Sequence, residues 1–205
     1  AVAPAYSGSL LTGTCRADYG VAFMGGSKED GVGTPIKEGN GVWWAVLAPF
    51  NLATPSGAVA QACHEVKPLS PVPLGVRLGV HWSPVALPLQ IMVIGQLAIV
   101  GVPFELTTVT GRRLRSAVLG TLGPRVKTVV IAGLANDYGG YVATREEYAK
   151  QHYEGASTQF GPWTETALRQ EMVAVACGVK GGDLHQARPW REVTPPDLTT
   201  KRLQI

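Results

Sequence analysis

The strongest constraint on the fold is an apolar hairpin followed by a helix and a third apolar strand. Leu89–Ile94 and Leu97–Val102 are apolar segments separated by a Gly-Gln pair, which is typical of a β-hairpin. A helix is expected to follow as far as about Leu122, and Val126–Leu134 has the β-branched, apolar pattern of a strand. Strand, helix and strand in this order predict an α/β fold with a mixed sheet and flanking helices.

The predicted helices carry residues that typically begin or end helices. One of the threonines at positions 107, 108 and 110 can cap the first helix, and Gly123 provides its stop. Thr144 and Glu147 have the spacing of a capping box, which predicts a second helix through about His152. A third helix is expected to end at Gly178, and its core face is marked by Leu168, Met172, Val175 and Ala176.

The composition limits the class of protein. With 205 residues, of which 45% are apolar, the chain is long enough to form one sizeable core. Basic residues exceed acidic ones by only three and cluster only in the first helix, so nucleic-acid binding is not expected. No apolar run approaches the roughly 18 residues of a membrane helix. The three cysteines lack zinc-site spacing, and Cys177 is expected to be a buried thiol.

Several segments have no regular periodicity. Residues 19–40 are rich in glycine and suit a loop around a site, but they lack the Gly-Lys-Ser/Thr ending of a phosphate-binding loop. Val66–Pro88 contains five prolines and predicts extended backbone, whereas Val42–Leu47 fits either a strand or the first turn of a helix. Residues 1–14 have the pattern of a connector, and residues 185–205 that of an interdomain linker.

The segment Asn136–Thr164 combines tyrosines, acids and glycine-marked turns directly after an apolar strand. A single tyrosine is commonly half buried for packing alone. Here a group of tyrosines accompanies Glu105, an acid that directly follows another apolar strand. Polar residues at strand ends are candidates for functional sites, so the sequence predicts one here. The tyrosines expected to converge are Tyr138, Tyr141, Tyr148 and Tyr153.

Three ordered runs resemble the neutral/alkaline ceramidase family: GVAFMGGSKEDGVGTPIKEGN, GVPFELTTVTGRRLR and NDYGGYVATREEYAKQHYEGASTQFGPWT. CHEVKPL and WSPVALPLQIMVIGQLAIVGVP are also similar, so the resemblance extends from Cys15 to about Ala174. Members of this family are secreted or membrane-surface zinc amidases that cleave ceramide into sphingosine and a fatty acid. The resemblance implies an α/β catalytic domain, which in the family precedes an immunoglobulin-like domain.

The resemblance implies roles for three residues of the predicted site. Glu105, in the run PFELTT, and Tyr141, the second tyrosine of NDYGGY, are similar to two zinc ligands of the family. Zinc accepts carboxylate oxygens, and a bound cation stabilises a phenolate. Tyr153 resembles a tyrosine that faces the substrate amide and can stabilise its oxyanion. The alternatives are a helix-capping acid at Glu105 and a structural tyrosine at Tyr153.

A disulfide and a pocket loop are also implied by the resemblance. Cys15 and Cys63 match two cysteines that are bridged in some members, which would place the protein in an oxidising secreted, cell-surface or periplasmic compartment. The glycine-rich loop, including Gly25 and Gly26, is implied to line the mouth of the substrate pocket. His64 is expected to be structural, as are the other three histidines.

The family's two histidine zinc ligands and its serine nucleophile, in a run of the Gly-Asp-Val-Ser-Pro-Asn type, have no counterpart in this sequence. We therefore expect residues 15–184 to be the C-terminal part of a catalytic domain, which shares its active site with an upstream part. The expected activity is zinc-dependent hydrolysis of ceramide, with peripheral membrane contact possible for a lipid substrate. The alternatives are a non-catalytic fragment or paralogue that binds lipid or a partner, and a zinc amidase for another N-acyl lipid.

Overall fold

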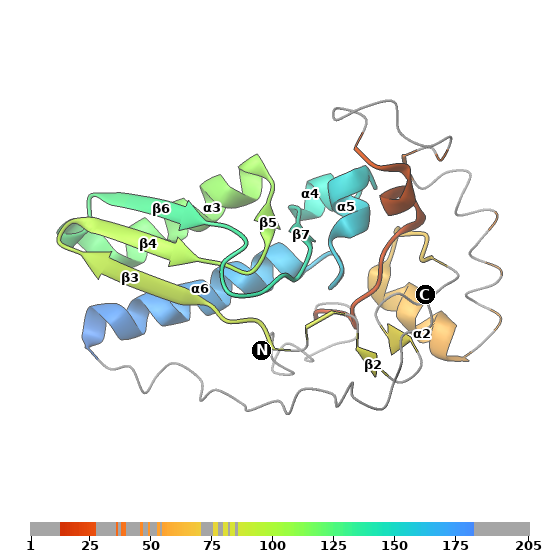
Figure 1. Cartoon of the computed structure of the whole chain (residues 1–205), viewed down its shortest axis with the longest axis horizontal. Coiled ribbons are helices and arrows are strands. Elements are labelled where there is room, and N and C mark those ends of the chain that lie inside the picture. The colour runs from red at the N-terminus through yellow and green to blue at the C-terminus, as the bar shows by residue number, and fades with distance from the viewer. Residues whose placement is uncertain are drawn as a thin grey trace.

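The fold is described from a computed structural model (Figure 1). It describes residues 13–27, 55–70 and 86–182, and the single positions 36, 38, 39, 46, 49, 53, 76, 77, 80, 81, 83 and 84. Three segments discussed in the sequence analysis lie wholly or largely outside these residues: the expected connector (1–14), the expected linker (185–205) and Val42–Leu47.

The predicted hairpin and the strand after it form a three-stranded mixed sheet (Figure 1). β3 (Gln90–Ile94) is antiparallel to β4 (Leu97–Gly101), and β6 (Thr128–Ala132) is parallel to β4. Between β4 and β6 the chain passes through α3 (Thr108–Leu122), because parallel neighbours need a crossover connection. The predicted α/β fold with a mixed sheet and flanking helices is confirmed.

The bounds of α3 follow from its capping residues. Thr107 is the N-cap, and its hydroxyl accepts a hydrogen bond from the backbone N–H of Thr110. Gly123 ends the helix with a φ of 74°, a conformation that glycine adopts without strain, and the short helix η3 (Gly123–Arg125) follows. The side chains that α3 buries are those of Thr110, Leu114, Val118 and Leu122.

A second long helix, α6 (Thr164–Gly181), packs along α3 on the same side of the sheet (Figure 1). It continues three residues past the predicted end, because a left-handed residue occurs only at Gly182. The prediction that Cys177 is buried is wrong, since this thiol is exposed. Cys177 is turned about 100° around the helix from the buried Ala176 and so leaves the core face. Among the described residues, the helices are all too short or too polar to span a bilayer.

A separate two-stranded parallel sheet carries the candidate site residues. β5 (Glu105–Leu106) lies beside β7 (Tyr141–Val142). After β7 come two short helices, α4 (Arg145–Tyr148) and α5 (Tyr153–Ser157). The predicted helix through about His152 is therefore shorter than expected, because Gln151 adopts a positive φ of 51° and interrupts it. Its predicted capping box is present at Thr144 and Glu147.

The N-terminal part of the described chain packs against α5. The 3₁₀-helix η2 (Val21–Gly25) contacts α5, and α2 (Pro55–His64) follows later in the chain. In the proline-rich segment, β1 (Val76–Arg77) and β2 (Val80–His81) form a minimal antiparallel pair. The predicted disulfide is present: Cys15 and Cys63 are bridged, which ties the segment before η2 to α2.

Removing this disulfide is expected to destabilise the fold. The bridge closes a loop between residues 48 positions apart, and Cys63→Ser should lower the free energy of unfolding by about 2–4 kcal/mol, because the unfolded chain regains loop entropy. Urea denaturation measures this difference. Cys177→Ser, which removes the exposed free thiol, is the matched control and should stay within about 0.5 kcal/mol of the parent. Equal midpoints for the two variants would contradict the expectation.

Candidate active site

Glu105 and Tyr141 lie opposite one another in the β5–β7 pair. This register places a carboxylate and a phenol side by side on neighbouring strands. Partial burial raises the pKa of Tyr141 well above its ordinary value, and a hydrogen bond to Glu105 and the charge of that carboxylate add to the shift. Tyr138 also contacts the carboxylate, because its hydroxyl donates to Glu105 Oε1 over 2.7 Å.

Tyr153, at the start of α5, completes the group. Its ring meets that of Tyr141 edge to face, with centroids 5.5 Å apart and planes at 73°. Its backbone N–H donates to Glu38 Oε1 over 3.2 Å. The structure therefore brings together four of the residues singled out in the sequence, namely Glu105, Tyr138, Tyr141 and Tyr153.

The expectation that Tyr148 joins this group is wrong. Tyr148 is 1% exposed, and its hydroxyl donates to the backbone oxygen of His64 over 2.9 Å. His64 is equally buried, and its Nε2 lies 2.9 Å from the backbone oxygen of Arg16. Burial lowers the pKa of His64 to about 3, so its ring is neutral. Tyr148 thus belongs to the packing between α4 and α2, and His64 is structural as predicted.

Lys67 is a fully buried residue that sequence reasoning missed. Its Nζ donates to the backbone oxygen of Thr158 over 2.6 Å and to that of Asp18 over 3.3 Å. It also lies 5.0 Å from the centroid of the Tyr148 ring, within range of a cation–π contact. Burial lowers the pKa of Lys67 to about 7. Lys67 connects the segment before η2 to the end of α5; no pattern around it in the sequence signals burial.

The glycine-rich segment approaches Tyr153 through η2. Phe23 stacks on Tyr153, with centroids 6.0 Å apart and planes at 14°, and Tyr19 contacts Phe23 with centroids 4.3 Å apart. A Cβ on Gly25 would lie 2.8 Å from the backbone oxygen of Ile36, and Gly26 has a φ of 70°. Glycine is therefore needed at both positions to fold this segment beside the site. A role for Gly25 and Gly26 at a pocket mouth stays a prediction.

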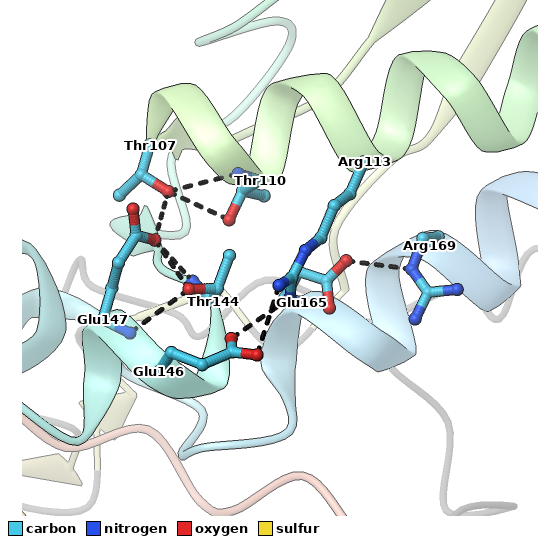
Figure 2. A network of polar contacts seen from close by, with 8 residues as sticks. All are labelled: Thr107, Thr110, Arg113, Thr144, Glu146, Glu147, Glu165 and Arg169. Atoms are coloured by element: carbon cyan, nitrogen blue, oxygen red, sulfur yellow. Dashed lines mark hydrogen bonds and ion pairs between the residues drawn. The ribbon is translucent and has the colours of Figure 1, made fainter.

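A hydrogen-bond network fixes the strands that carry the site (Figure 2). Glu147 Oε2 accepts from the hydroxyl of Thr107 over 2.7 Å and from the backbone N–H of Thr144 over 2.8 Å. Thr107 directly follows β5 and Thr144 closely follows β7, so this one carboxylate joins the ends of both strands. Because Thr107 is the cap of α3, Glu105 does not serve as its cap.

A cavity of about 400 Å³ adjoins the group on the side of Tyr141. The residues that line it include Thr107, Glu147, His152 and Glu154. The guanidinium carbon of Arg145 lies over the ring of Trp163, 4.2 Å from its centroid. Among the described residues, no cluster of three or more His, Cys, Asp or Glu side chains is placed to hold a metal ion. The two oxygen donors Glu105 and Tyr141 thus fit part of a zinc site, which normally takes at least three protein ligands.

Known proteins resemble this chain over most of its length. Residues 4–170 match the family model for the N-terminal part of neutral/alkaline non-lysosomal ceramidase. Neutral ceramidase A of Dictyostelium discoideum is 39% identical in a match that covers 91% of this chain and 26% of the relative. Neutral ceramidase of Pseudomonas aeruginosa is 38% identical in a match that covers 81% of this chain and 25% of the relative. A solved structure described as ceramidase complexed with C2 superposes with a TM-score of 0.70 at 35% identity, covering 92% of this chain and 29% of its own.

The crystal structure of neutral ceramidase from Pseudomonas aeruginosa superposes with a TM-score of 0.65 at 31% identity. The chain spans about a quarter of the length of the curated relatives it matches. These relatives are hydrolases, and the match includes the β5–β7 pair and α5. The chain belongs to the neutral/alkaline ceramidase family.

Proposed function

We propose that this chain supplies part of the active site of a zinc-dependent amidase that hydrolyses ceramide to sphingosine and a fatty acid. The observation that carries the proposal is the pairing of Glu105 with Tyr141 across β5 and β7, with Tyr153 against the Tyr141 ring. A carboxylate, a potential phenolate and a phenol donor in one cluster match the oxygen ligands and oxyanion donor of such a site.

Glu105 and Tyr141 would hold the metal from this chain. A bound zinc ion would polarise the amide carbonyl and activate the attacking oxygen. Zinc sites of this class have three or more protein ligands, so further ligands are needed. By the family resemblance, two histidines and the serine nucleophile would come from the upstream part of the catalytic domain. Within this assignment, residues 15–184 are the C-terminal part of that domain, and residues 185–205 lead toward an immunoglobulin-like domain.

Tyr153 would donate its phenolic hydrogen to the oxygen of the amide as charge develops there. Stacking on Phe23 and the edge contact with Tyr141 restrict its ring, so the donor is oriented before substrate arrives. Gly25 and Gly26 would let the chain turn closely beside this ring and line the mouth of the lipid pocket.

The upstream part of the domain would pack on the face of the β3–β4–β6 sheet that no described helix covers. Three side chains on this face are largely exposed: Met92 and Ile94 at 59% each, and Val130 at 47%. The register places all three on the side opposite the helices, where Met92 and Val130 flank Ile99 and Ile94 lies beside Leu97. A continuous apolar sheet face is characteristic of an interaction surface.

A ceramidase acting on a membrane lipid, with the Cys15–Cys63 bridge, would work outside the reducing cytosol, at the cell surface, in secretions or in the periplasm.

Metal removal tests the proposal directly. We expect the protein purified from its natural host to contain about one zinc ion per chain and to release fatty acid from a fluorescent ceramide. A chelator should abolish this release, and added zinc should restore it, because the oxygen donors alone cannot polarise the amide. The rates of hydrolysis of ceramide and of an N-acyl amine with an acyl chain of equal length are compared, which distinguishes a ceramidase from an amidase for another N-acyl compound. Release that persists after complete zinc removal would contradict the proposal.

A further inference from the structure

Tyr138 is the one member of the site group that the proposed chemistry leaves without a role. Its hydroxyl donates to Glu105 Oε1 over 2.7 Å, across 33 residues of sequence. Its side chain is 43% exposed, so the tyrosine contributes little to the core. A polar contact made by an exposed tyrosine, aimed at one carboxylate oxygen, is poorly explained by packing.

The loop that carries Tyr138 is fastened to the segment that carries Glu105. The backbone N–H of Gly139 donates to the oxygen of Pro103 over 2.6 Å, and the N–H of Glu105 donates to the oxygen of Gly140 over 3.0 Å. Ahead of Tyr138, the N–H of Ala135 donates to the oxygen of Val102 over 3.0 Å. These bonds on both sides of Tyr138 fix its distance from Glu105 through the backbone.

Glycine at two positions makes this fastening possible. A Cβ on Gly139 would lie 2.5 Å from the ring of the buried Phe104. Gly140 has a φ of 81°, and a Cβ there would lie 3.0 Å from the backbone oxygen of Ser157. The Gly-Gly pair therefore lets the loop press against residues 103–105, which brings the Tyr138 hydroxyl to the carboxylate.

A carboxylate has about four lone-pair positions on its two oxygens, so the bonds from Tyr138 and Tyr141 still leave lone pairs for a metal ion. Hydrogen bonds to a ligating carboxylate fix its rotamer and its basicity. We propose that Tyr138 is a positioning residue that holds the Glu105 carboxylate in the orientation required to bind the metal, an inference that rests on the proposed function.

Tyr138→Phe tests this inference, because it removes one oxygen and keeps the ring. Zinc affinity, measured by competition with a chromophoric chelator, should fall about 10–100-fold, the range found for lost partners of metal ligands. Hydrolysis by the variant should fall at limiting zinc and return to the parent rate in excess zinc. If Tyr138 instead contacted the substrate, excess zinc would not restore the rate. Unfolding of the metal-free protein should be unchanged, because Tyr138 is largely exposed.

Tyr19→Phe is the matched control. Its hydroxyl accepts from Gln159 Nε2 over 2.8 Å, so this variant also removes one phenolic oxygen near the site and should retain the parent's zinc affinity. If the parent binds no zinc, the proposed function itself fails. If the parent binds zinc and Tyr138→Phe binds it equally tightly, or stays slow in excess zinc, the positioning role is overturned and the proposed function stands.

Discussion

Glu105→Gln is expected to lower zinc affinity by more than about 100-fold and to abolish hydrolysis at ordinary zinc concentrations. Loss of an outer partner of a metal ligand costs roughly 10–100-fold in affinity, and loss of a charged ligand should exceed that range. The amide of glutamine keeps the shape of the carboxylate but removes its charge, so the loss reports on the ligand's charge and not on packing. Chelator competition and fatty-acid release measure the two effects.

Glu146→Gln is the matched control for this substitution. Glu146 forms an exposed ion pair with Arg113 at 3.2 Å, separate from the bonds that join Thr107, Glu147 and Thr144 (Figure 2). Exposed pairs contribute about 0–1 kcal/mol to stability, so zinc affinity and hydrolysis should remain at parent values. A Glu105→Gln variant that binds zinc as tightly as Glu146→Gln would remove Glu105 from the metal site.

The sequence predicted the elements whose signals are local. The limits of α3 were predicted from Gly123 and from Thr107 or a neighbouring threonine, and the capping box of α4 was predicted from Thr144 and Glu147. These signals are readable because capping depends on residues within one turn. The end of α4 was missed, since Gln151 interrupts the helix through a positive φ that is uncommon for residues other than glycine. Cys177 lies in an apolar stretch of helix but outside the core face formed by Leu168, Met172 and Ala176, so its apolar neighbours alone predicted its burial wrongly.

Part of the site was visible in the sequence, and part depended on tertiary contacts. Glu105 and Tyr141 were found through the family motifs, and the structure adds that they are direct partners in a parallel strand pair. Tyr148 carries the same phenol but turns toward His64, a distinction set by packing between α4 and α2. Lys67 forms its bonds to residues far away in sequence, so no local pattern could reveal its burial.

Tyr153→Phe is expected to lower kcat about 100- to 1,000-fold with little change in KM. Removing one oxyanion donor typically costs this much, because its hydrogen bond strengthens only as negative charge develops on the amide oxygen. Phenylalanine keeps the stack on Phe23 and the edge contact with Tyr141, so the fold and the zinc site should be retained. Steady-state hydrolysis of ceramide at saturating zinc separates kcat from KM.

Tyr148→Phe gives the opposite result and is the control for Tyr153→Phe. It deprives a buried backbone oxygen of His64 of its donor, so the free energy of unfolding should fall by about 1–3 kcal/mol while kcat stays at the parent value. The same chemical change at two tyrosines five residues apart would then affect catalysis at one and stability at the other. A Tyr153→Phe variant with the parent's kcat would make Tyr153 a structural tyrosine.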